Sequence, residues 1–309
     1  MPGSTQTRDK GQPKVKLPGW EPQMMSWARR AERSCIVDPV ANQPLAQQIQ
    51  NEPLNTAAVA PLKLLSFNIQ VGIKTSAYRQ YFTKGWKHVL PHVSRGKNLS
   101  RIADLVTGYD LVSLQEIDGG SIRSGFVNQV EYLSQVAGFP YWYAQLNRDL
   151  GPIAQHGNGL LSRIEPMGLE DHKLPGVIPG RGAVFMRLPY AGDEIVVVML
   201  HLSLGKQSRD RQLAYVVEQV AHERQVIVMG DMNTPVSTLL EDSPLKRLNL
   251  QPAETVGPTY PAWEPSLALD HVLVSDNLVI KDYQVLNCRV SDHLPIAVEV
   301  AARARPPVQ

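Results

Sequence analysis

Short apolar runs recur along residues 62–300, and their spacing predicts a body built from both strands and helices. Glu194–Leu200 is rich in β-branched residues and predicts a fully buried strand. Helical spacing is found in Leu99–Val106, Gln129–Ala137 and Arg209–Glu223. The other predicted strands are Leu62–Phe67, Asp110–Leu114, Gly159–Ser162, Gly182–Leu188, Gln225–Met229, His271–Val274 and Ile296–Val300.

These elements mix through one continuous stretch of chain with no internal linker and no repeat period. About nine strands and at least three helices predict an α/β or α+β fold in layers. We therefore expect one domain over residues 61–303, followed by a short tail at residues 304–309.

The first part of the chain, residues 1–60, is rich in Pro, Gln, Ser and Asn and lacks sustained apolar periodicity. This composition predicts a disordered or loosely attached extension. A short helix around Met24–Arg33, acting as an interaction element, is the alternative interpretation.

Composition supports a globular protein. The chain has 309 residues, of which 43% are hydrophobic and 19% charged. Cys35 and Cys288 are too few for a disulfide framework and too far apart for a cysteine zinc site. The longest aliphatic run, Ile195–Leu200, is too short to span a bilayer, and the N-terminus lacks the apolar core of a secretory signal. We therefore expect a cytoplasmic protein.

The charge is unevenly distributed along the chain. The net charge of +2 argues against a strongly basic coat for nucleic acid. Residues 60–302 carry 22 basic and 24 acidic side chains, yet Lys74–Arg101 holds seven basic residues and no Asp or Glu. This segment is either an anion-binding rim or one solvated basic loop.

Polar residues follow several of the predicted strands at the point where each strand ends. Any one of them alone is more typical of a turn, a cap or a surface charge than of a functional site. Strand ends that share an edge of a layered sheet lie close together, however, and ligand sites form there. The residues are Asn68, Glu116, His201, Asp231, Asn233, Asp270, Asp292 and His293.

The order of these motifs resembles the endonuclease/exonuclease/phosphatase family, which includes deoxyribonuclease I, sphingomyelinases and inositol-polyphosphate phosphatases. Gly-Asp-Met-Asn (230–233) and Ser-Asp-His-Leu-Pro (291–295) are the most specific matches. The others are Leu-Leu-Ser-Phe-Asn-Ile (64–69), Leu-Gln-Glu (114–116), Gly-Asn-Gly-Leu-Leu-Ser-Arg (157–163), His-Leu-Ser (201–203) and Leu-Asp-His-Val-Leu (269–273). The resemblance implies a four-layer sandwich, with two packed mixed β-sheets flanked by helices.

The resemblance also implies a metal site. Asn68 and Glu116 would hold Mg²⁺ or Mn²⁺, with Glu116 as the principal ligand, and Asp292 would lie beside them. Carboxylate and amide oxygens suit these cations. A divalent metal beside a phosphate neutralises charge in the transition state of phosphoester cleavage.

Five further residues receive catalytic roles by the same resemblance. His293 would take a proton from the attacking water, and Asp270 would hold its tautomer. Asp231 is the competing candidate for water activation. Asn233 would donate its amide to a phosphate oxygen, and His201 would donate a hydrogen bond or a proton.

One segment departs from part of the family. Abasic-site endonucleases carry a Tyr-x-Pro-Asn type of segment where this chain has His201-Leu202-Ser203. The sequence therefore does not support abasic-site specificity. We interpret His271 as structural. Arg181, in Gly-Arg-Gly, could reach a phosphate, but we favour a turn residue outside the site.

The sequence indicates the substrate less directly than it indicates the reaction. Lys74, Arg79 and Trp86 are candidate substrate contacts, because cations interleaved with aromatic residues suit a nucleic-acid backbone or an anionic membrane surface. The sequence favours a nuclease-like phosphodiesterase. The first alternative is a phosphodiesterase or phosphatase acting on phospholipid, inositol phosphate or another small phosphoester. The second alternative is a non-catalytic phosphate-binding module, which is disfavoured because every expected catalytic position is filled. The partner is a phosphoester substrate, with peripheral membrane contact as one alternative.

Overall fold

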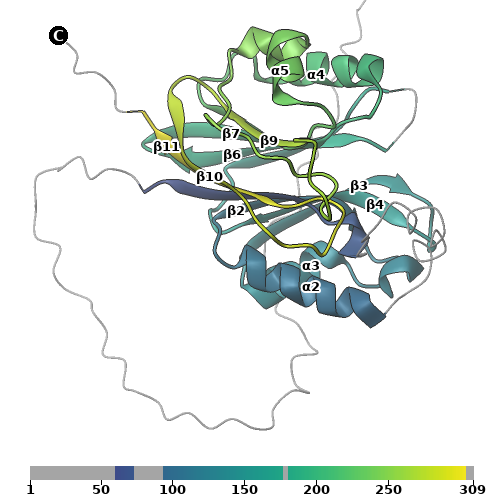
Figure 1. Cartoon of the computed structure of the whole chain (residues 1–309). Coiled ribbons are helices and arrows are strands. Elements are labelled where there is room, and N and C mark those ends of the chain that lie inside the picture. The colour runs from purple at the N-terminus through teal and green to yellow at the C-terminus, as the bar shows by residue number, and fades with distance from the viewer. Residues whose placement is uncertain (1–59, 73–92, 177–179, 304–309) are drawn as a thin grey trace, which may run out of the picture. The chain divides into compact units, whose positions relative to one another are not determined.

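A computed structural model describes residues 60–72, 93–176 and 180–303, and Figure 1 shows two β-sheets in this body. The strand orders are β10-β11-β1-β2-β4-β3 and β5-β6-β7-β8-β9. The six-stranded sheet contains β1 (Leu62–Asn68), β2 (Leu111–Asp118), β3 (Tyr141–Asp149), β4 (Gln155–Ser162), β10 (Leu278–Val285) and β11 (Ile296–Ala302). The five-stranded sheet contains β5 (Gly168–Lys173), β6 (Gly182–Tyr190), β7 (Asp193–His201), β8 (Val226–Asp231) and β9 (Asp270–Val274).

Each sheet is mixed. β1 pairs parallel with β2 and antiparallel with β11. β8 pairs parallel with β7 and antiparallel with β9. Because both parallel pairs involve central strands, the carboxyl ends of β1 and β2, and of β7 and β8, lie together at one end of each sheet.

The inner faces of the two sheets form the central core. Leu64 on β1 and Leu160 on β4 lie in one buried cluster with Met199 on β7 and Met229 on β8. Side chains alternate between the two faces of a strand, so the odd and even residues of each strand contact different layers. Leu65 and Phe67, for example, pack on the outer face.

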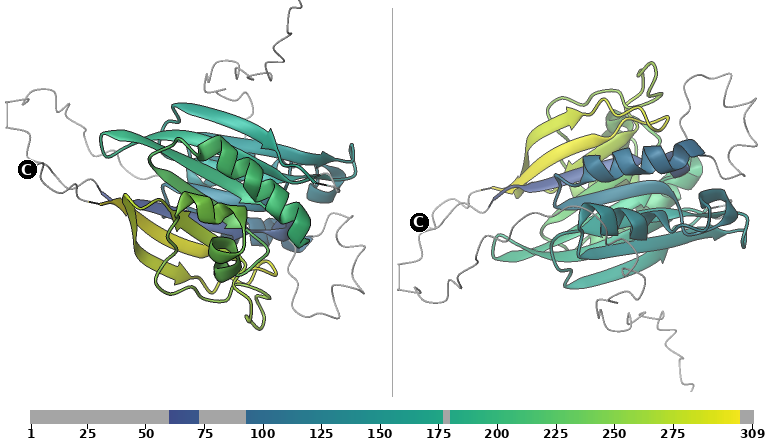
Figure 2. Two further views of the ribbon diagram at one scale, coloured as in Figure 1. Left: turned by 90° about the horizontal axis from the view of Figure 1, so that it is seen from above. Right: turned by 90° about the horizontal axis from the view of Figure 1, so that it is seen from below.

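Helices cover both outer faces, as the two views in Figure 2 show. On the six-stranded sheet, buried residues of the two helices α2 and α3 pack against the strands. On the five-stranded sheet, α4, α5 and the short 3₁₀ helix η5 do the same. The bounds are α2 (Val93–Val106), α3 (Gln129–Ala137), α4 (Lys206–Val220), α5 (Val236–Glu241) and η5 (Pro244–Leu248). The predicted four-layer sandwich of two mixed sheets is therefore confirmed.

The sequence pattern did not predict three of the strands, and all three lie at the edge of a sheet. β3 and β10 flank the six-stranded sheet, and β5 flanks the other. An edge strand buries fewer side chains, so its apolar signal is weak. β5, with the sequence GLEDHK, has no buried residue. The expected helix around Met24–Arg33 lies outside the described residues, and no helix within the described ranges is long and apolar enough to cross a membrane.

Gly230 lets two central strands approach closely just before the polar end of β8. Its φ is 141°, and a Cβ atom there would lie 1.9 Å from the carbonyl oxygen of Leu200 on the parallel neighbour β7. Only glycine fits both constraints. Gly192, in the hairpin between β6 and β7, also has a positive φ of 73° but has no atom within 4 Å of such a Cβ.

These two glycines give a matched test of the close approach. We expect Gly192→Ala to lower the free energy of unfolding by about 1–2 kcal/mol, because only the backbone conformation is strained. Gly230→Ala should lower it by more than about 3 kcal/mol, because a steric clash is added to the strain. Urea unfolding followed by circular dichroism measures both. Equal losses for the two variants would contradict the close approach of β7 and β8.

Candidate active site

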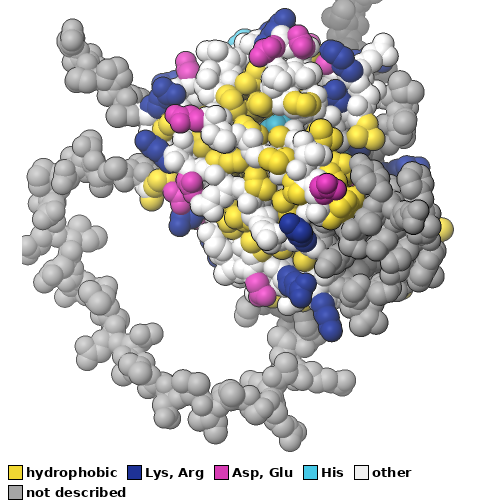
Figure 3. Space-filling model, in the orientation of Figure 1, with side chains coloured by type: hydrophobic (Ala, Val, Ile, Leu, Met, Phe, Trp, Pro, Cys, Tyr) yellow, Lys and Arg dark blue, Asp and Glu magenta, His cyan; other side chains and the backbone are white. Residues whose placement is uncertain are grey.

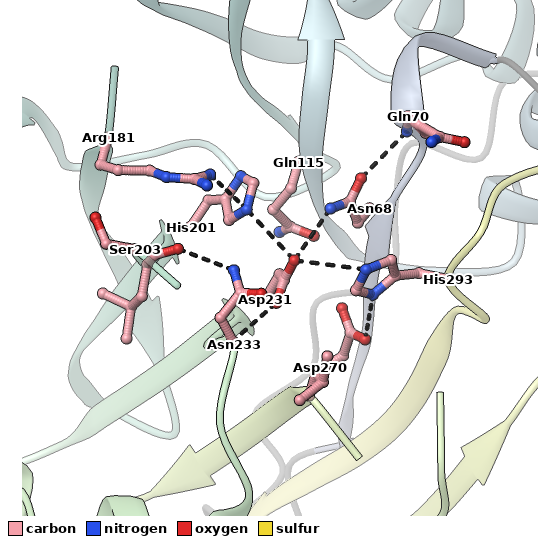
Figure 4. A network of polar contacts seen from close by, with 12 residues as sticks. Asn68, Gln70, Gln115, Arg181, His201, Ser203, Asp231, Asn233, Asp270 and His293 are labelled. Carbon is pink, nitrogen blue, oxygen red and sulfur yellow. Dashed lines mark hydrogen bonds and ion pairs between the residues drawn. The ribbon is translucent and has the colours of Figure 1, made fainter. Parts of the chain in front are cut away.

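The inner faces of the strands change from apolar to polar at one end of the sandwich. On β7, Met199 belongs to the central core and His201, two residues later, lies on the same face beyond it. On β8, likewise, Met229 belongs to the central core, and Asp231, two residues later, lies on the same face beyond it. Figure 4 shows how the polar side chains from these strands converge. They include Asn68, Gln115, His201, Asp231 and Asp270, all of which are buried.

Asp270 and His293 form a buried hydrogen-bonded pair. His293 Nδ1 lies 2.8 Å from Asp270 Oδ2, and Thr259 donates its hydroxyl to the same oxygen at 2.6 Å. This contact fixes the ring so that Nε2 faces Asp231, at 3.8 Å from Asp231 Oδ2. Burial lowers the pKa of His293, but the charges of Asp270 and Asp231 outweigh burial and raise it to about 10.

Asp231 lies at the centre of the cluster. Asn68 Nδ2 donates to Asp231 Oδ2 at 3.0 Å, and the backbone N–H of Asn233 donates to Oδ1 at 3.0 Å. Burial raises the pKa of Asp231, as does the charge of Asp270. One ligand atom each from Asp231, Asp270 and His293 lie within 4.8 Å of one another. Asn233 has a φ of 50°, and its side-chain amide donates to Leu202 O at 2.9 Å.

A second acidic group lies on the other side of Asn68. The backbone N–H of Gln70 donates to Asn68 Oδ1 at 3.1 Å, while its side-chain amide donates to Asp292 Oδ2 at 3.1 Å. Burial raises the pKa of Asp292 to about 6, and the charge of Glu116 adds to the effect. Gln70 thus joins Asn68 to Asp292, and the charge of Glu116 acts on Asp292. That Asn68, Glu116 and Asp292 hold a metal stays a prediction. The sequence did not predict a role for Gln70, because nothing in its sequence context distinguishes it from a turn residue.

A β-bulge directs Glu116 away from the regular path of β2. Leu114 pairs with Gly159 and Ile117 with Gly157, so Gln115 and Glu116 together face only Asn158. Glu116 has a φ of 55°. Bulges occur next to active sites, where they reorient a side chain. Here the bulge leaves Gln115 fully buried and Glu116 half-buried.

Asp118 fixes the chain that follows Glu116. Its carboxylate accepts from the backbone N–H groups of Gly120 and Ser121 at 2.9 and 2.7 Å. It also accepts from the hydroxyls of Ser121 and Ser124 and from Arg123 Nε. Burial acts to raise the pKa of Asp118, but these hydrogen bonds outweigh it and lower the pKa to about 2.

Arg181 lies in the site, contrary to the sequence interpretation. It immediately precedes β6, and its Nη1 lies within hydrogen-bond distance of His201 Nε2. Burial, the charge of Arg181 and the charge of His293 hold the pKa of His201 well below its usual value. His201 is therefore neutral, and its Nε2 accepts this bond instead of donating one. The Gly-Arg-Gly sequence alone gave no signal that the arginine faces inward.

Buried side-chain amides bind β6, the strand that directly follows Arg181. Asn158 Nδ2 donates to Gln145 Oε1 at 2.9 Å and to Gly182 O at 3.1 Å. Gln145 Nε2 donates to Ala183 O at 3.1 Å. Because Asn158 also lies opposite the bulge at Glu116, it joins the strand of Glu116 to the strand that follows Arg181. These hydrogen bonds connect the two sheets at the polar end of the core.

The remaining predicted residues have simpler outcomes. His271 is buried, and its Nε2 lies 2.9 Å from Thr234 O, which fits the structural role expected for it. Lys74, Arg79 and Trp86 lie outside the described residues.

Replacing Asp118 tests how the loop after Glu116 is held. Asp118→Asn leaves Arg123 buried without its carboxylate, so we expect the free energy of unfolding at neutral pH to fall by about 3 kcal/mol. The folded pKa of about 2 lies below the unfolded value, so this stabilisation is present above the unfolded pKa. It is lost as the pH falls toward 2.

Guanidinium unfolding at several pH values should therefore show the two proteins converging in acid. Asp104→Asn, at an exposed position of α2, should stay within about 0.5 kcal/mol of the wild type at neutral pH. A difference between wild type and Asp118→Asn that is constant with pH would contradict the role of the ionised carboxylate.

Comparisons with known proteins identify the fold and its chemistry. The family described as "Endonuclease/Exonuclease/phosphatase family" matches residues 65–293. The uncharacterized protein YbhP of Escherichia coli (strain K12) is 27% identical over 264 residues, covering 77% of this chain and 95% of YbhP.

Two solved structures share the fold. An endonuclease/exonuclease/phosphatase from Beutenbergia cavernae DSM 12333 superposes with a TM-score of 0.63 and 19% identity, over 81% of this chain and 73% of that one. The mannosyl-6-phosphatase Bt3783 of Bacteroides thetaiotaomicron VPI-5482 gives a TM-score of 0.58 and 18% identity, over 78% and 99%. Because the family match spans most of the chain, this protein belongs to the endonuclease/exonuclease/phosphatase family of phosphoester-hydrolysing enzymes.

Proposed function

We propose that the chain is a Mg²⁺- or Mn²⁺-dependent phosphodiester hydrolase in which His293, oriented by Asp270, activates water. The observation that carries this proposal is that two buried carboxylates, Asp231 and Asp292, lie beside the hydrogen-bonded pair of Asp270 and His293. Burial raises the pKa values of the carboxyls of Asp231 and Asp292, and a divalent cation would compensate the charge of such buried carboxylates. The Asp270–His293 pair lies directly beside them.

The donor atoms fit a hard divalent cation. Asn68, Glu116 and Asp292 offer amide and carboxylate oxygens and no sulfur, so these residues would hold the ion. Asp231, Asp270 and His293 also lie within reach of one another, but the bond between His293 Nδ1 and Asp270 already occupies that pair. When bound, the cation would neutralise phosphate charge and weaken the negative potential that raises the pKa of His293.

Residues of the chain supply the other steps. Asp270 holds the Nδ1 proton of His293, which leaves Nε2 to take the proton of an attacking water. Asp231 accepts hydrogen bonds from the side chain of Asn68 and the backbone N–H of Asn233. These bonds hold the end of β1 next to the end of β8. Arg181, which donates to His201 Nε2 on the side of Asp231 away from His293, would bind phosphate oxygens.

Nucleic acid and phospholipid remain the two candidate classes of phosphodiester. The nucleic-acid prediction rests largely on the basic segment 74–101, most of which lies outside the described residues. Among the described residues, Asp and Glu outnumber Lys and Arg. On the face drawn in Figure 3, basic and acidic side chains are interspersed instead of forming a basic stripe. On this face, therefore, the described residues offer no basic stripe for a nucleic-acid backbone.

Hydrolysis of bis-p-nitrophenyl phosphate with added Mg²⁺ or Mn²⁺ tests the proposal without naming the natural substrate. Glu116→Gln removes the principal ligand charge and His293→Gln removes the base, so each should lower kcat/KM by about 10²-fold or more. EDTA should abolish the activity of the wild type.

Exposed residues of the same types serve as controls. Glu254→Gln and His222→Gln, both at exposed positions, should retain full activity. Undiminished hydrolysis in EDTA would refute the metal dependence. A His293→Gln variant with wild-type activity would refute water activation by that side chain.

A further inference from the structure

Phe126 combines two features that rarely occur together. Its backbone has a φ of 62°, a left-handed conformation that strains a bulky residue and that glycine or asparagine adopts more easily. Its side chain is 69% exposed, so the ring has little packing that would offset the strain. Strain retained at an exposed apolar residue points to a role outside the fold.

The loop that carries Phe126 is held in place. The backbone N–H of Phe126 donates to Ser121 O at 2.8 Å. Ser121 is in turn bound to Asp118 through both its backbone and its hydroxyl. The ring is therefore presented to solvent by a fixed loop and does not fold back on the core.

A neighbouring hairpin adds further exposed apolar side chains. The backbone N–H of Ile122 donates to Pro152 O at 2.7 Å, which joins the loop after β2 to the hairpin between β3 and β4. Large apolar side chains are exposed on both segments. We call them the apolar rim: Phe126, Val127, Leu146, Leu150 and Ile153.

The apolar rim lies at the same end of the six-stranded sheet as the candidate active site. Its first loop follows Glu116 directly, and Asp118 at the end of β2 pairs with His156 at the start of β4. The hairpin therefore opens beyond the site end of β2. Figures 1 and 2 place the ends of β3 and β4 at the edge of the described body.

We infer that the apolar rim inserts into the acyl region of a phospholipid bilayer, while a lipid phosphate occupies the active site. This inference rests on the proposed phosphodiesterase function and names phospholipid as its substrate class. A phospholipid joins acyl chains to a phosphodiester within one molecule. A site flanked by exposed apolar loops matches that arrangement, because the loops contact the acyl region while the phosphate stays at the interface.

The chemistry of the rim distinguishes this occupant from two others. Four of the five side chains are aliphatic and have no π face on which a nucleobase would stack. The exposed charged residues beside them, Arg148 and Asp149, have opposite charges, so the contact is apolar and not electrostatic. A second copy docked on the rim would lie across the end of the sheet that holds the active site and would obstruct the substrate.

Cosedimentation of the full chain with phosphatidylcholine vesicles tests the inference. The wild type should bind, and binding should persist at high salt, because apolar contacts are not screened. Phe126→Gly should lower the partition coefficient by about tenfold or more, the expected effect of losing one buried aromatic side chain. Its melting temperature should be unchanged or higher, because glycine relieves the strain at this φ.

Two further variants make the result specific. Ile153→Ser, on the other segment of the rim, should also weaken vesicle binding by about tenfold. Met167→Ser changes a side chain that is 63% exposed but follows the opposite end of β4, and it should bind as the wild type does. All three variants should hydrolyse bis-p-nitrophenyl phosphate normally, whereas the rim variants should lose activity on lipid in vesicles.

Three results would overturn the inference. The first is absence of vesicle binding by the wild type, the second is binding that Phe126→Gly leaves unchanged, and the third is a dimer in sedimentation that Phe126→Gly dissociates. Failure of the proposed hydrolase function would give a different result from failure of this inference. The wild type would bind vesicles but would not hydrolyse bis-p-nitrophenyl phosphate.

Discussion

The burial of negative charge at the polar end of the inter-sheet core is the constraint on which the rest of the site depends. Asp231, Asp270 and Asp292 lie where the inner faces of the strands stop being apolar. Burying carboxylates is unfavourable unless hydrogen bonds or cations compensate. Asn68 and His293 supply part of that compensation, while burial raises the pKa values of Asp231 and Asp292. A divalent cation would complete the compensation.

Several irregular features of the backbone serve this cluster. The bulge at Glu116 adds an acidic side chain, and Gly230 allows β8 to approach β7 closely just before Asp231. The backbone of Asn158 lies opposite the bulge, and its side chain binds the strand that follows Arg181, so one residue connects the acidic and basic sides of the site. Regular strands alone would not bring these groups together.

The sequence predicts the elements with strong apolar patterns and the residues that follow them, because strand ends converge by geometry. Gln129–Ala137 was predicted with the bounds found in the structure, whereas the edge strands β3, β5 and β10 lack a comparable pattern. The sequence does not reveal Arg181 or Gln70, because their roles depend on which way a turn residue points. It also does not reveal the strained exposure of Phe126, which depends on hydrogen bonds from a loop closed by Asp118.

Proton release on metal binding tests the central claim most directly. Asp292 has a pKa of about 6, so near pH 6 it is partly protonated and must lose its proton to bind a cation. Calorimetric titration with Mn²⁺ in buffers of different ionisation enthalpy should show net proton release near pH 6, and less release in Asp292→Asn at the same pH. Mn²⁺ binding without proton release, or binding unaffected by both Asp292→Asn and Glu116→Gln, would contradict the account.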